Sequence, residues 1–162
     1  MSKNRVVRAL LIATLLVIVT MAAPARATNR DQRSTAIVGA WLVTTGAGGK
    51  ALHTYHADGT VNGSVQGEIS NTSPLGSHTL QHGVWRHLGG RRFAATLMDV
   101  FYDINTGQLK GFGNVSTVLT ISRDGDEMTA EARVHIVDPD GNVLVDRAGT
   151  ASYQRITFTR PD

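Results

Sequence analysis

Six histidines are the side chains of this chain best suited to bind a metal or transfer a proton. Their spacing decides whether they act together. His53 and His56 stand three residues apart, so on a strand they point to opposite faces. His78, His82 and His87 lie in or beside the run 79–88, and only His78 and His82 share a face there. Because a metal site needs three or more converging ligands, we predict no metal site and no cofactor from the set His53, His56, His78, His82, His87 and His135.

The carboxylates do not form a recognisable catalytic pair. Five aspartates belong to Gly-containing turns, where the side chain binds backbone amides; they are Asp58, Asp124, Asp126, Asp138 and Asp140. Asp99 differs because it lies within an apolar run. The chain has no cysteine and no G-x-S-x-G elbow, and its Gly-rich stretch precedes a strand-like run. We therefore predict no catalytic residues.

Apolar and aromatic side chains on strand-like runs are the remaining candidates for a binding site. Alternate residues of a strand face the same side, so one set should line the interior of a curved sheet. Sites for small molecules are mostly apolar with a few polar groups. We predict ligand binding at one end of the sheet by Tyr55, Val65, Phe93, Leu97, Val115, Leu119 and Val134.

The elements that must position these residues are eight short strands. The run 127–137 is typical: Met128, Ala130, Ala132 and Val134 alternate with polar residues. Asp-Gly and Asn-x-Gly turns separate most runs, and no long stretch has helical periodicity. The predicted strands are 36–45, 51–56, 60–69, 79–88, 91–102, 109–122, 127–137 and 143–158. They predict an all-β, eight-stranded antiparallel up-and-down barrel, with a β-sandwich as the alternative.

The ends of this array carry a recognisable motif. Gly39-Ala40-Trp41 resembles the G-x-W motif of lipocalins and the wider calycin superfamily, which also place an arginine of the last strand against that tryptophan; Arg155 is its counterpart. The ordered segments GAW, YHADGT, HGVW, DGD, DPDGN and RI resemble secreted bacterial lipocalin-like proteins over residues 36–158. The resemblance implies that Gly39, Trp41 and Arg155 close one end of the barrel. From the alternation along its strand, we place Trp85 at the same end.

The first 27 residues read as a secretory signal. Lys3, Arg5 and Arg8 precede an uncharged run over 9–23, and Ala25-Arg26-Ala27 is a small-x-small cleavage site. Cleavage after Ala27 predicts a secreted or periplasmic protein with no stable membrane anchor. It removes four of the 16 basic residues, leaving 12 against 13 acidic ones, so nucleic acid is not an expected partner. Residues 28–35 are expected to form a flexible arm, and 36–160 the barrel domain.

These observations lead to a functional hypothesis. We expect an exported lipocalin-like barrel that binds a small, mostly apolar molecule without covalent chemistry. The alternatives are a cyclase or isomerase on the same scaffold, or a haem-binding protein that uses His53 or His82, as some calycin barrels do. A buried position for Asp99, His53 or His82 would favour an enzyme; exposure of all three would count against it.

Overall fold

The computed structural model describes residues 34–66 and 75–158 as an all-β domain. Three predicted segments lie outside the described residues: the signal, arm residues 28–33, and residues 67–69 of the predicted strand 60–69. Within the described part, no helix is long and apolar enough to cross a bilayer. The strands are β1 (Gly39–Thr45), β2 (Lys50–Tyr55), β3 (Thr60–Val65), β4 (Ser77–His78), β5 (Gln81–Gly89), β6 (Arg92–Tyr102), β7 (Leu109–Ile121), β8 (Glu127–Val137) and β9 (Val143–Arg155).

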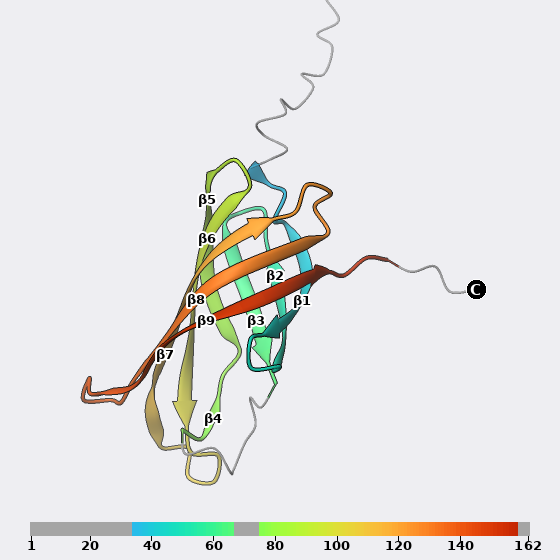
Figure 1. Ribbon diagram of the computed structural model, residues 1–162. Coiled ribbons are helices and arrows are strands. Elements are labelled where there is room, and N and C mark those ends of the chain that lie inside the picture. Colours follow the sequence, from blue (N-terminus) through green and yellow to red (C-terminus); the bar gives the residue numbers. More distant parts are fainter. Residues whose placement is uncertain (1–33, 67–74, 159–162) are drawn as a thin grey trace, which may run out of the picture.

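Eight of these strands close into one antiparallel barrel, as predicted (Figure 1). Each strand pairs with the next along the chain, and the first and last pair through Trp41 and Arg155. The sandwich alternative is wrong because the strands form a single closed sheet. Closure removes the free edges that an open sheet would expose and tilts the strands against the barrel axis.

The extra strand β4 continues β5 along the same edge of β6. His78 pairs with Phe101 and His82 pairs with Met98, so β4–β5 spans four residues where β6 spans three. This is a β-bulge, and it bends the strand. The predicted strand start at residue 79 is wrong by two residues because the bulge at Thr79–Leu80 breaks the alternation on which the prediction rests.

The barrel has a packed end and an open end. The packed end carries the turns β2–β3, β5–β6 and β7–β8, and its core contains Ile37, Trp41 and Met128 among other fully buried side chains. At the opposite end, β9 pairs with β1 only from Ala151 to Arg155. Its residues Val143 and Val145–Gly149 pair with β8 alone, and the β8–β9 hairpin extends past the rest of the barrel (Figure 1).

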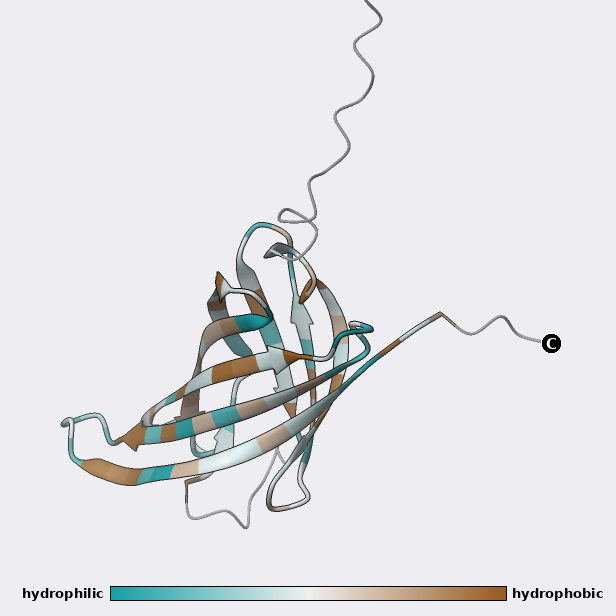
Figure 2. Cartoon of the chain, turned by 45° about the horizontal axis from the view of Figure 1, so that its top comes forward, coloured by the Kyte–Doolittle hydropathy of each residue, from teal (hydrophilic) through white to brown (hydrophobic). Residues whose placement is uncertain are grey.

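The hydropathy pattern matches the fold on most strands and departs from it at the open end. Brown and teal bands alternate along most strands, which reflects one buried and one solvated face (Figure 2). The first residues of β9 are an exception, because Val143, Leu144 and Val145 are all apolar; Val143 and Leu144 are exposed. The structure therefore leaves apolar surface at the open end, where the hairpin stands away from β1.

Candidate functional site

The packed end is closed by Trp41 and Arg155. The guanidinium carbon of Arg155 lies 4.2 Å from the indole centroid, and the indole Nε1 donates to the Ile37 carbonyl at 2.9 Å. Arg155 also donates to the carbonyls of Val38, Ala36 and Gly125, at 2.9, 2.6 and 2.8 Å. These contacts tie the N-terminal segment, the last strand and the β7–β8 turn into one plug.

Gly39 makes this plug possible. Its φ of 136° lies in the region that favours glycine, and a Cβ there would stand 2.7 Å from Arg155 Nη1. Glycine is therefore required twice at this position, by the backbone conformation and by the guanidinium beside it.

Part of the predicted ligand set lies in the packed core. Tyr55, Phe93 and Leu119 are fully buried, and the Trp85 ring lies 6.5 Å from Tyr55 and 5.9 Å from Phe93. Trp85 Nε1 donates to the His56 carbonyl at 2.9 Å. The rings of Tyr55 and Phe93 thus share one cluster with Trp85. The sequence had placed Tyr55 and Phe93 at the ligand end and Trp85 at the closed end.

The rest of the set lies nearer the open end. Four inward-facing residues form a row in which each pairs with the next across β6 to β9: Leu97, Val115, Val134 and Arg147. Leu97 is fully buried, the two valines are half-buried, and Arg147 is exposed. Exposure therefore rises along the row toward β9. Val65 on β3 is also half-buried.

A row of inward-facing polar side chains lies next to the row of Leu97, Val115 and Val134, one inward position nearer the open end on each strand. The paired positions run from His53 through Gly63 to Gln81, and Gln81 Nε2 donates to Asp99 Oδ2 at 3.2 Å. Asp99 in turn pairs with Gly113 on β7. We call His53, Gly63, Gln81, Asp99 and Gly113 the polar row. Its three side chains are each 6% exposed.

The two glycines of the polar row provide its space. A Cβ at Gly113 would come within 2.0 Å of Asp99 Oδ1. A Cβ at Gly63 would lie 2.9 Å from the His53 ring and 3.0 Å from Gln81 Oε1. Each glycine thus lies beneath a polar side chain from a neighbouring strand.

Asp99 is the acidic member of the row. Besides Gln81, it meets His78 Nδ1 at 3.4 Å, and the His78 side chain is 12% exposed. A carboxylate held this deep needs such partners, because burial of an uncompensated charge is costly. The arrangement could accept a proton from a bound molecule or bind a hydrogen-bond donor.

His53 lies at the other end of the row and is held neutral. Burial lowers its pKa to about 4, and its ring lies 5.6 Å from that of Tyr153. Burial also raises the pKa of Tyr55 well above its usual value, with a further contribution from Tyr153, whose own pKa burial raises to about 12. The side chains of His53, Tyr55 and Tyr153 therefore stay uncharged at neutral pH.

Two buried polar atoms in this region have no hydrogen-bond partner within the described part of the chain. They are His53 Nδ1 and Tyr55 Oη. The hydroxyls of Tyr55 and Tyr153 are close enough for a hydrogen-bond interaction to shift the pKa of both, but the contact falls short of a full hydrogen bond to Tyr55 Oη. Buried polar atoms in native proteins are nearly always paired, often with water or a ligand, so these two mark a place for a polar partner.

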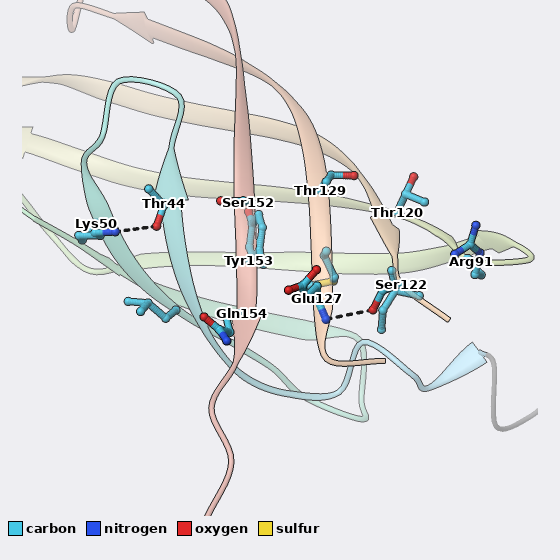
Figure 3. Close-up of a pocket in the computed structure, with 13 residues that line it drawn as sticks. Thr44, Lys50, Arg91, Thr120, Ser122, Glu127, Thr129, Ser152, Tyr153 and Gln154 are labelled. Carbon is cyan, nitrogen blue, oxygen red and sulfur yellow. Dashed lines mark hydrogen bonds between the residues drawn. The ribbon is translucent and has the colours of Figure 1, made fainter. Parts of the chain in front are cut away.

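Two surface hollows lie outside the barrel, about 430 and 670 Å³ in volume. In the first, Thr44, Ser152, Thr129 and Thr120 form a line across four strands, with Lys50 and Arg91 at its ends (Figure 3). These residues alternate with inward-facing ones, so the lining is hydroxyl-rich and solvated. None of the seven predicted ligand residues lines either hollow.

Sequence reasoning missed Gln81, Tyr153 and the approach of His78 to Asp99. His82, a predicted haem-ligand alternative, faces solvent, and the described residues contain no group of three or more metal-ligating side chains. The inward glycines Gly63 and Gly113 were the available signal, because a glycine in a strand often makes room for a neighbour. The pairing needed to name that neighbour depends on the register.

The closed antiparallel barrel, its plugged end and its polar row define the class of protein: an eight-stranded β-barrel of a form compatible with the lipocalin-like fold. Comparison of the chain with family models, curated proteins and solved structures finds no match.

Proposed function

We propose that this protein is an exported lipocalin-like carrier that binds a small, mostly apolar molecule at the open end of the barrel. The observation that supports it best is the inward face of β9. Gly149 pairs with the inward-facing Ala132, yet a Cβ at Gly149 would meet no atom within 4 Å. Gly149 is itself exposed, so this inward position opens to solvent where β9 is not paired with β1, and a guest molecule can enter there.

The surroundings of Gly149 support the same proposal. Val134 and Val145 face inward and are half-buried, while Ala132 and Ala151 are too small to fill the interior. An eight-stranded barrel is just wide enough for its own side chains or for one small ligand. Small and half-exposed apolar residues on one wall favour the binding of a ligand.

A lipid-extract pull-down analysed by mass spectrometry tests the proposal. We expect the wild-type protein to retain apolar molecules, and Gly149→Leu to retain few, because the added side chain occupies the open space. Thr150→Leu is the matched control, since it adds a similar side chain to the exposed outward position next along the strand. Recovery of nothing by folded wild-type protein, or equal recovery by both variants, would contradict it.

A cyclase or isomerase on the same scaffold is the second candidate. Its support is the burial of both Asp99 and His53, while His82 faces solvent. In such an enzyme the Asp99 carboxylate would take a proton from the carbon beside a carbonyl, and the proton would later return to the ligand.

Deuterium exchange separates this candidate from simple binding. With 2-dodecanone in D₂O, an enzyme of this type should incorporate deuterium beside the carbonyl faster than buffer, and Asp99→Asn should abolish the excess. Asp126→Asn, which changes an exposed acid, should leave it unchanged. Exchange at the buffer rate by the wild-type protein would exclude proton abstraction from this probe class.

Export is part of the proposal and rests on the sequence of residues 1–27. The mass of protein recovered outside the cytoplasm should correspond to a chain beginning at Thr28. An intact N-terminus at Met1 in that fraction would contradict it.

A further inference from the structure

We infer that the ligand of this barrel carries an uncharged hydrogen-bonding head, such as an alcohol, that binds His53 and Tyr55 in the barrel interior. This inference rests on the proposed function and narrows its ligand class. The geometric basis is the pair of buried atoms, His53 Nδ1 and Tyr55 Oη, that no described residue satisfies.

The two atoms belong to one local group. His53 and Tyr55 are two residues apart on β2 and both face inward, with ring centroids 6.3 Å apart in an edge-on arrangement. Tyr153 completes the group, because its ring lies 5.6 Å from His53. A tyrosine hydroxyl can donate and accept, and a neutral imidazole nitrogen does one or the other according to its tautomer. A hydroxyl on a ligand can serve both.

The chemistry of this group selects against charged heads. His53, Tyr55 and Tyr153 are uncharged at neutral pH, as their shifted pKa values indicate. The arginine of the closed end, Arg155, is occupied by three carbonyls and Trp41. A carboxylate head would therefore meet no buried cation here, which is unfavourable.

A cationic head is the other charged possibility. It would pair with Asp99, whose carboxylate already meets Gln81 and His78. Such a head would leave His53 Nδ1 and Tyr55 Oη unpaired. An uncharged head is preferred because it can form hydrogen bonds with the two unpaired atoms.

Three probes with the same chain test the inference: 1-dodecanol, dodecanoate and dodecylammonium, each titrated by calorimetry at pH 7. We expect dodecanol to bind at least tenfold more tightly than dodecanoate. Tyr55→Phe should weaken dodecanol binding about five- to tenfold, the usual value of one lost hydrogen bond, and leave dodecanoate unaffected. His53→Leu should act in the same direction.

Tyr102→Phe is the matched control, because it removes a tyrosine hydroxyl from the end of β6, away from the polar row. Circular dichroism checks that each variant folds; Tyr55→Phe removes a hydroxyl that makes no full hydrogen bond, although it lies near that of Tyr153. If no probe binds the wild-type protein, the proposed function fails. If probes bind but Tyr55→Phe has no effect, or the ammonium binds most tightly and depends on Asp99, the present inference fails while the binding function stands.

Discussion

Arg155 stacks on Trp41 across the strands that close the barrel, with the guanidinium carbon 4.2 Å from the centre of the indole. The two residues are also direct partners in the β1–β9 pairing. One side chain therefore seals the interior, joins the first strand to the last and binds the carbonyls of two flanking segments. The plug is a structural device that closes one end of the barrel.

The first prediction concerns this plug. Arg155→Leu should lower the free energy of unfolding by about 3 kcal/mol, because it leaves three carbonyls without their donor and removes the cation–π contact. The melting temperature should fall by about 10 °C. Arg133→Leu, which removes an exposed ion pair to Asp146, should change stability much less, because solvent screens the pair. Equal losses in the two variants would mean that the plug contributes no more than a surface pair.

Gly39 should be intolerant of a side chain for two separable reasons. Gly39→Ala is expected to cost about 3 kcal/mol, from the positive φ and the contact with Arg155. Gly141→Ala shares the positive φ in open space and should cost about 1 kcal/mol. Adding Arg155→Leu to Gly39→Ala should recover the difference, measured as coupling in a double-mutant cycle. Strict additivity would contradict the steric part.

Gly113 should be required by Asp99. Gly113→Ala places a Cβ within 2.0 Å of Asp99 Oδ1, so the carboxylate must move from its partners, at a cost of about 2 kcal/mol. Gly149→Ala, where a Cβ meets nothing, should be neutral or slightly stabilising. Chemical denaturation of both variants gives the comparison, and a neutral Gly113→Ala would show that Asp99 is not fixed.

Stability should fall in mild acid because of His53. Its pKa is about 4 when folded and about 6.5 when unfolded. Between these values the unfolded chain binds the proton and the folded protein does not, so acid favours unfolding. Between pH 7 and pH 5 the loss from this residue should be about 2 kcal/mol.

Urea unfolding at the two pH values measures that loss. His53→Leu should remove most of the pH dependence, whereas His82→Gln, at an exposed position, should retain it. An unchanged pH dependence in His53→Leu would show that another group titrates.

The order and class of the strands could be predicted from local sequence. Alternation in 127–137 and the Asp-Gly turns are local features, and they recur in β8 and its flanking turns. The expectation that Trp41 and Arg155 face each other came from a resemblance at the two ends of the domain, and the structure has that contact. Strand boundaries could be predicted less accurately where a bulge interrupts the alternation, as between β4 and β5.

What the sequence by itself determined was the two-residue alternation and the turns, which together require a sheet with one apolar face. Only the tertiary structure decided that Asp99 meets Gln81 and His78, that His53 and Tyr55 keep unpaired atoms, and that Gly149 faces open space. The reason is physical: strand register and closure bring together residues distant in sequence, and a shift of one residue would turn each of them to the opposite face.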